Sequence, residues 1–248
     1  MDTVATPLDG AEACLFDLDG VLTPTSAIHR WAWGELFAQV FALYPKVRKF
    51  TDEDYYNLVD GRPRYDAVQA VLNSRGIPLP LGDTSSQSES PSMCTVCGIG
   101  DLKDALFLGR LKQNPVAPYP GSMRFLQAIA KTGIGLGVVS ASKNARQVLE
   151  SAGIVGEFDV IVDGLVAEEM GLAGKPDPAP YLEAANRLGA APRSTIVIED
   201  ALNGVASGQA GGFGWVIGVD RGVGTEALLT HGATLVVTDL KELVEERK

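Results

Sequence analysis

Two aspartates one residue apart follow an apolar run near the start of the chain. Residues 13–16 are apolar and lead into Asp17 and Asp19, with Gly20 next. An apolar run that ends in carboxylates and glycine is typical of a buried strand that ends at a site. Two carboxylates this close repel each other, and Mg²⁺ relieves such repulsion through oxygen ligands. A metal-bound carboxylate can attack phosphorus, so this stretch predicts nucleophilic phosphoryl chemistry, with an Asp-rich turn as the alternative.

Three further strand-like runs also end in side chains that suit a phosphate or a metal. A hydroxyl beside the free amides of a helix start favours phosphate, although an ordinary serine cap has the same pattern. A lysine held between glycine and proline is a placed cation, and a second acidic pair is costly unless a cation binds it. In chain order these groups are Ser140 with Ala141 and Asn144, then Lys175, then Glu199 with Asp200.

Strands that alternate with helices must position these groups. The sequence predicts strands at 13–18, 134–139, 158–162, 195–198, 214–218 and 234–237, and helices at 122–131, 143–152, 178–188, 201–209 and 239–246. This alternation is typical of an α/β fold with a Rossmann-like, doubly wound parallel sheet covered on both faces. Ligands bind such sheets beyond the carboxyl ends of the strands. We therefore expect all four groups to meet at one edge.

The segment 25–113 differs in texture, because it holds helical patterns and no strong strand. We expect helices at 26–44, capped by Ser26, from Thr51, at 65–74 and at 101–113, with a long loop at 76–100. Three prolines in 114–120 indicate a linker. The predicted organisation is a discontinuous α/β core, 1–24 and 114–248, with an all-helical cap domain inserted at 25–113.

Composition narrows the class of partner. The formal net charge of −10 argues against nucleic acid, which selects basic surfaces, but leaves room for a small phosphorylated ligand. The early sequence has no membrane span and no basic secretory signal, so we expect a cytoplasmic protein without a membrane partner. Three cysteines fit a reducing compartment. Cys94 and Cys97 lack the further ligands that zinc needs, so we expect two reduced thiols in a loop. The oligomeric state stays open.

The four groups together resemble the motifs of the haloacid dehalogenase superfamily of phosphotransferases. The resemblance covers nearly the whole chain, including the position of the helical insertion. It is strongest for the β-phosphoglucomutase-like subgroup, through Thr25, His29, Trp33, Arg64 and Lys103. The sequence departs from that pattern at Pro24 and in the Ser-rich stretch 83–92.

The resemblance implies a role for each core residue. Asp17 would be the nucleophile that forms an aspartyl phosphate, and Asp19 the general acid/base toward the sugar oxygen. The predicted Mg²⁺ ligands are Asp17, the carbonyl of Asp19, Asp200 and the neighbouring Glu199. The phosphoryl group would be held by Ser140, Ala141, Asn144 and Lys175.

The resemblance also implies that the cap residues select the substrate. Arg64 would clamp a distal phosphate, with Lys103 adding a charge, while Thr25 and His29 would act near Asp19. The predicted activity is that of a Mg²⁺-dependent sugar phosphomutase, passing phosphate between C1 and C6 of a hexose. The alternatives are a phosphatase for a small phosphate ester, a dehalogenase, for which the acidic pairs would be superfluous, and a non-enzymatic phospho-acceptor signalling domain.

Overall fold

A single six-stranded parallel sheet forms the centre of the protein. The computed structural model describes residues 10–83 and 92–244. The strands lie in the order β3-β2-β1-β4-β5-β6, and every neighbouring pair is parallel. Their bounds are β1 Ala13–Phe16, β2 Gly135–Val139, β3 Val160–Val162, β4 Thr195–Glu199, β5 Trp215–Val219 and β6 Leu235–Val237. With β1 central and neighbours added on both sides, this is the doubly wound, Rossmann-like fold that the sequence predicts.

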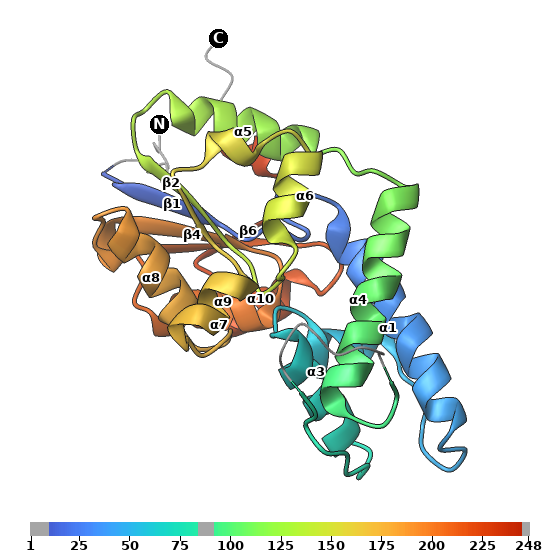
Figure 1. Ribbon diagram of the computed structural model, residues 1–248. Helices are drawn as coiled ribbons and strands as arrows, with labels where there is room; N and C mark the ends of the chain where they lie inside the picture. Colours follow the sequence, from blue (N-terminus) through green and yellow to red (C-terminus); the bar gives the residue numbers. More distant parts are fainter. Residues whose placement is uncertain (1–9, 84–91, 245–248) are drawn as a thin grey trace.

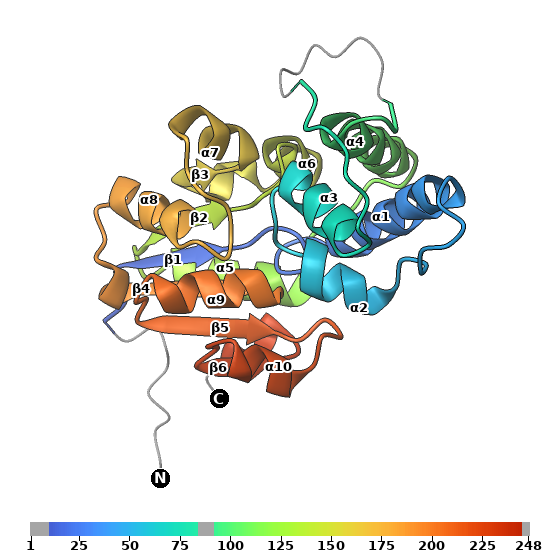
Figure 2. The same cartoon turned by 90° about the horizontal axis from the view of Figure 1, so that it is seen from below.

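Helices cover both faces of the sheet (Figure 1, Figure 2). Alternate residues of β1 explain the two layers: Cys14 and Phe16 belong to one apolar cluster, whereas Leu15 belongs to the other. The first cluster includes α5 (Pro120–Ala130), α6 (Ala145–Ser151) and the 3₁₀ segment η4 (Leu240–Leu243). The second includes α7 (Gly164–Met170), α8 (Ala179–Arg187), α9 (Leu202–Ala210) and α10 (Thr225–Thr230). Short 3₁₀ segments, η2 (Val155–Glu157) and η3 (Pro192–Ser194), connect elements of this core.

The segment between β1 and α5 forms a helical cap beyond the carboxyl ends of the strands (Figure 1). It comprises α1 (Thr25–Ala42), α2 (Asp52–Asp54), the π-helix η1 (Tyr55–Val59), α3 (Arg64–Asn73) and α4 (Val96–Gln113). Its described residues contain no strand. It has an apolar core of its own, which includes Phe37, Val68 and Ile99. Where the chain leaves and re-enters the sheet domain, the amide of Tyr119 donates to the carbonyl of Leu22 at 2.9 Å.

The last helix of the cap begins earlier than the sequence predicts. Helix α4 starts at Val96, not at residue 101, and Thr95 caps it by accepting from the amide of Gly98 at 3.0 Å. Gly98 and Gly100 suggested a loop, but each is a site of close packing. A Cβ on Gly100 would lie 2.7 Å from the Tyr65 ring. The predicted loop is therefore shorter, and residues 84–91 lie outside the described part.

Most other predicted elements agree with the structure within two residues. The predicted cap by Ser26 is wrong, because α1 starts at Thr25 after Pro24 and has no side-chain cap. Helices α7 and α10 were not predicted, since each spans fewer than eight residues and is flanked by glycine. The predicted last helix is a 3₁₀ turn at 240–243, and its remaining residues from 245 lie outside the described part.

Candidate active site

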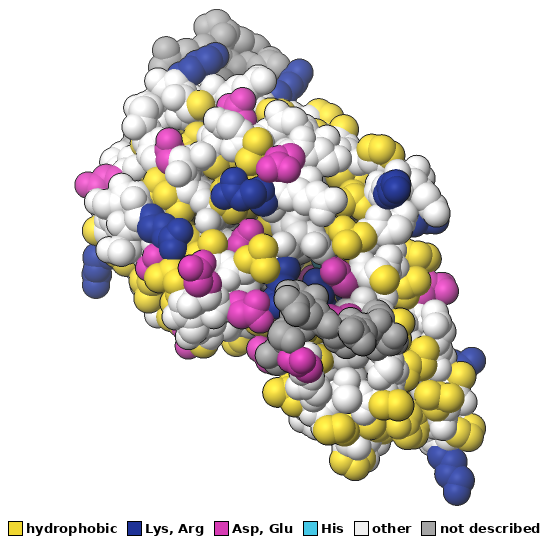
Figure 3. All heavy atoms as spheres, in the orientation of Figure 1, with side chains coloured by type: hydrophobic (Ala, Val, Ile, Leu, Met, Phe, Trp, Pro, Cys, Tyr) yellow, Lys and Arg dark blue, Asp and Glu magenta, His cyan; other side chains and the backbone are white. Residues whose placement is uncertain are grey.

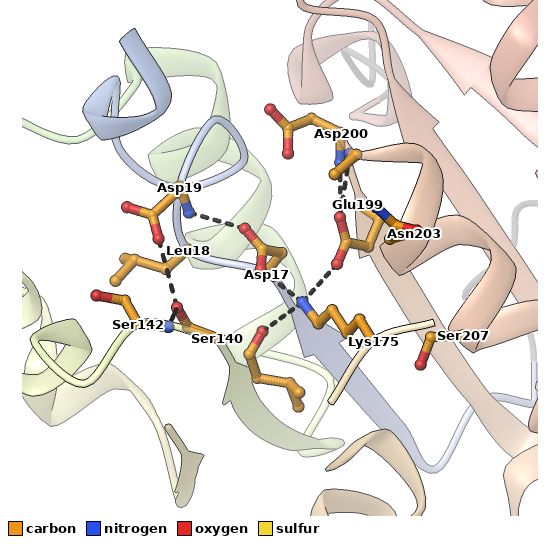
Figure 4. A network of polar contacts seen from close by, with 12 residues as sticks. Asp17, Leu18, Asp19, Ser140, Ser142, Lys175, Glu199, Asp200, Asn203 and Ser207 are labelled. Carbon is orange, nitrogen blue, oxygen red and sulfur yellow. Dashed lines mark hydrogen bonds and ion pairs between the residues drawn. The ribbon is translucent and has the colours of Figure 1, made fainter. Parts of the chain in front are cut away.

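Lys175 joins the ends of three different strands (Figure 4). Its ammonium donates to Asp17 Oδ1 at 2.7 Å, to Glu199 Oε1 at 2.5 Å and to the carbonyl of Val139 at 3.0 Å. Three acceptors satisfy all three hydrogens of the ammonium. The residue is only 3% exposed. Burial would lower the pKa of Lys175, but the adjacent carboxylates of Asp17 and Glu199 outweigh burial and raise it. Lys175 is therefore a permanent positive charge beside Asp17.

Glu199 is a buried carboxylate with a complete set of donors. Besides Lys175, it accepts from the Tyr181 hydroxyl at 2.8 Å and from the amides of Asp200 and Ala201 at 3.1 and 3.2 Å. Its side chain needs the space beside Gly204, where a Cβ would lie 1.8 Å from Oε1. Tyr181 was missed at the sequence level, because a tyrosine in the middle of a helix carries no motif signal. Glu199 and Tyr181 fix the position of Lys175.

Three carboxylates can converge on a cation. Asp17, Glu199 and Asp200 each offer an oxygen, and these oxygens lie within 4.8 Å of one another. Burial raises the pKa of Asp17 and of Asp200 well above the ordinary range, and neighbouring carboxylates contribute to both shifts. Such a cluster gains stability from a hard divalent ion. Gly20 leaves the room, because a Cβ there would lie 1.8 Å from Asp200 Oδ2. The residues fit Mg²⁺.

Asp19 lies beside this cluster and faces the other way (Figure 4). Its amide donates to Asp17 Oδ2 at 2.8 Å, while its carboxylate accepts from the Thr25 hydroxyl at 2.5 Å. Ser140 Oγ lies 3.4 Å from Oδ2, and His29 Nε2 lies 3.4 Å from Oδ1. Burial would raise the pKa of Asp19, but His29 and Thr25 outweigh burial and lower it to about 2. Asp19 is therefore ionised and ready to accept a proton.

A second buried cation of the cap reaches Asp19 through His29. Lys103 Nζ lies 2.5 Å from His29 Nδ1, and the imidazole stacks on the Phe107 ring at 4.0 Å between centroids. Burial, together with the charge of Arg64, lowers the pKa of Lys103 to about 7. Burial and Lys103 likewise lower the pKa of His29. Three of the predicted cap residues, Thr25, His29 and Lys103, thus connect to Asp19.

Arg64, the fourth predicted cap residue, is paired with carboxylates of the cap itself. Its Nη2 lies 2.6 Å from Asp104 Oδ1, and Nη1 lies 3.6 Å from Asp101 Oδ1. The same Asp104 oxygen accepts from Asn144 Nδ2 of the core at 2.7 Å. Two predicted phosphate ligands, one from each domain, therefore share one carboxylate oxygen. Ala141 lies on the wall of the cavity between the domains.

The cap rests directly on the loops that follow the strands. Pro63 packs on Gly174, where an added Cβ would lie 2.1 Å from Pro63 Cγ. On the other side of the same turn, Asn203 Nδ2 donates to the carbonyl of Asp60 at 2.7 Å. A cavity of about 290 Å³ lies between the domains, with Asp17, Asp19 and Lys175 in its wall. Figure 3 shows acidic and basic side chains gathered at this junction.

The cysteines take no part in this site. Cys94 is exposed, whereas Cys14 and Cys97 are buried, and all three are free thiols. Cys97 lies in α4 and not in a loop, which corrects the sequence prediction. Among residues 10–83 and 92–244, the only group of metal-ligating side chains that converges is the carboxylate set above. No helix in those ranges is long and apolar enough to cross a membrane.

Comparison with known proteins gives consistent relatives. The sequence model of one family, described as "Hydrolase: haloacid dehalogenase-like hydrolase", matches residues 11–212. The chain is 41% identical over 241 residues to a beta-phosphoglucomutase of Mycobacterium bovis, covering 94% of this chain and 91% of that protein. It is 27% identical over 229 residues to the phosphorylated carbohydrates phosphatase of Thermotoga maritima, covering 91% and 94%. The crystal structure of a beta-phosphoglucomutase from Clostridium difficile is similar with a TM-score of 0.73 at 26% identity, covering 94% and 93%.

Proposed function

Because the chain belongs to the haloacid dehalogenase-like hydrolases, and within them to the β-phosphoglucomutase-like subgroup, we propose that it is a sugar phosphomutase. It would convert β-glucose 1-phosphate to glucose 6-phosphate through an aspartyl phosphate on Asp17. The observation that carries this proposal is the pair Asp17 and Asp19. One carboxylate is held by Lys175 among the metal-binding groups, and the other is ionised and turned toward the cap.

The two aspartates have complementary tasks in the proposed cycle. A sugar hydroxyl attacks phosphorus of phospho-Asp17, Asp19 accepts the hydroxyl proton, and the P–O bond to Asp17 breaks. The resulting bisphosphate turns over and presents its other phosphate. Asp17 then attacks that phosphorus while Asp19 returns the proton to the leaving sugar oxygen. The ionised state of Asp19 suits the first of these steps.

The surrounding groups would stabilise the transferring phosphoryl group. Lys175 and Ser140 supply a cation and a hydroxyl where charge spreads over the phosphoryl oxygens. Mg²⁺, held by Asp17, Glu199, Asp200 and the carbonyl of Asp19, would neutralise part of that charge. Thr25 and His29 hold the Asp19 carboxylate in position. The contact of Pro63 with Gly174 supports a closed cap that keeps water from phospho-Asp17.

A phosphatase is the second candidate, since the same residues would serve if water attacked phospho-Asp17. The similarity to a phosphorylated carbohydrates phosphatase favours keeping it. A signalling domain that merely holds a phosphate is a poorer match. It would need neither a cap nor the hydrogen bonds that position Asp19.

The decisive experiment offers the purified protein β-glucose 1-phosphate, Mg²⁺ and a trace of glucose 1,6-bisphosphate. Glucose 6-phosphate and free phosphate are followed together. A mutase forms glucose 6-phosphate with little free phosphate, whereas a phosphatase releases phosphate in step with substrate loss. Asp17→Asn is the control and should abolish either reaction. Turnover by that variant would refute the proposed mechanism.

A further inference from the structure

Five basic side chains other than histidine line the cavity between cap and core, and four of them already have partners. Lys175 binds Asp17 and Glu199, and Lys143 binds Glu168 at 2.7 and 2.8 Å. Arg64 binds Asp104, and Lys103 contacts His29. The fifth is Arg62, whose side chain has no hydrogen bond or ion pair with any described residue. Its Nε is buried without a partner.

The backbone around Arg62 fixes its place above the reacting groups. Gly61 lies against Ala201, where an added Cβ would be 3.3 Å from the alanine Cβ, and Pro63 packs on Gly174. The amide of Arg62 donates to the carbonyl of Val59 at 3.0 Å. Arg62 is thus held between two core contacts, one next to Asp200 and the other next to Lys175.

A buried guanidinium nitrogen without an acceptor is unfavourable unless a ligand supplies the acceptor. An anion with several oxygens, such as a phosphate, suits the planar fork of arginine donors. We propose that Arg62 is the residue that binds the non-reacting phosphate of the sugar substrate. The naming of a sugar phosphate rests on the proposed function, whereas the anion site rests on the geometry.

Arg64 has a different task in this proposal. Its Nη2 and Asn144 Nδ2 meet at the same oxygen of Asp104, so the three side chains bridge the cap to the core. A phosphate that took Arg64 from Asp104 would leave a carboxylate facing the incoming anion, and like charges repel. Arg64 is therefore a positioning residue that holds the cap against the core.

Two variants separate these tasks. Arg62→Gln removes the unpaired cation, while the double variant Arg64→Gln/Asp104→Asn removes the bridging pair without changing net charge. Binding of glucose 6-phosphate is measured by calorimetry with Mg²⁺ in the Asp17→Asn background, which prevents turnover. We expect Arg62→Gln to weaken binding by at least about 10-fold, Arg62→Lys to restore part of it, and the double variant to stay within about 3-fold.

The opposite ranking, with the double variant losing binding and Arg62→Gln retaining it, would overturn the proposal. So would absence of glucose 6-phosphate binding to the Asp17→Asn protein. Melting temperatures confirm that each variant is folded. Failure of the proposed reaction is distinguishable, because it is read from turnover by the unmodified protein. Arg62-dependent binding without mutase turnover leaves the anion site standing, and turnover that survives Arg62→Gln unchanged leaves only the reaction standing.

Discussion

The ammonium of Lys103 and Nδ1 of His29 lie 2.5 Å apart, although α1 and α4 bring them together from positions 74 residues apart. Both side chains are buried against aromatic rings: Lys103 lies over Trp33 and Phe107, and His29 stacks on Phe107. An apolar site of this kind disfavours the charged ammonium. A neutral Lys103 can accept a hydrogen bond from His29, whereas a charged Lys103 must donate one.

The stability of the protein should therefore depend on pH through Lys103. Its pKa is about 7 in the folded protein, below the model value of 10.5. Below pH 7 both states carry the proton and burial costs its full amount. As the pH rises toward 10 the folded state loses the proton first, so stability increases. Relative to Lys103→Met, the wild-type free energy of unfolding should gain about 2 kcal/mol between pH 7 and pH 9 in urea titrations. Lys112→Met, an exposed position of α4, should show no such trend.

Gly174→Ala should uncouple phosphoryl transfer from exclusion of water. The new Cβ would lie 2.1 Å from Pro63 Cγ, so the cap must move away from the core. Transfer to the sugar should fall by about 10-fold or more, and the share of turnover that yields free phosphate should rise. The ratio of glucose 6-phosphate to phosphate is the measurement. Gly156→Ala is the matched control, because nothing lies within 4 Å of its added Cβ. An unchanged ratio for Gly174→Ala would show that this contact does not close the cap.

Asp200→Asn should stabilise the metal-free protein and remove its response to Mg²⁺. Burial and the neighbouring carboxylate of Asp60 raise the pKa of Asp200, so its ionised form is unfavourable near neutral pH. In EDTA we expect a gain of about 1–2 kcal/mol in the free energy of unfolding, read from urea titrations. Added Mg²⁺ should then stabilise wild type but not the variant. Asp220→Asn should act in the opposite direction in EDTA, because Asp220 accepts from the amides of Gly222 and Gly224 at 2.9 and 3.1 Å. A loss of stability in Asp200→Asn would contradict the prediction.

Asp54 is expected to hold the cap together. Its carboxylate binds Arg75, whose side chain is 1% exposed, and Arg48, whose side chain is 60% exposed. Asp54→Asn leaves the buried guanidinium without its counter-charge and should cost about 3 kcal/mol in the free energy of unfolding. Arg48→Ala removes a solvent-exposed partner and should cost less than about 1 kcal/mol. Thermal and urea denaturation test both, and equal losses would show that the buried pair has no special weight.

The sheet and the meeting of the acidic groups were predictable, because parallel strands with a shared direction end at one edge. The fold class and the family are confirmed on this basis. The roles of Asp17, Asp19, Ser140, Lys175, Glu199 and Asp200 stay predictions. Tyr181 could not be found, since its contact with Glu199 depends on how α8 packs on the sheet.

Contacts across the two domains were also beyond the reach of the sequence. The pairing of Arg64 and Asn144 with Asp104 depends on where the closed cap lies, which no local pattern encodes. The start of α4 was misplaced because glycine weakens a helix in isolation, whereas here Gly98 and Gly100 allow neighbouring chain segments to come close.

The hydrogen bond between Tyr119 and Leu22 has a consequence for how such a chain can diversify. The two ends of the helical segment meet at one point beside the sheet, so the segment is a closed excursion of the main chain. Lengthening it, shortening it or exchanging it for another fold requires no change in strand order or register. Substrate choice and chemistry are thereby encoded in physically separable stretches of one gene, and recombination at two neighbouring joints suffices to exchange one of them.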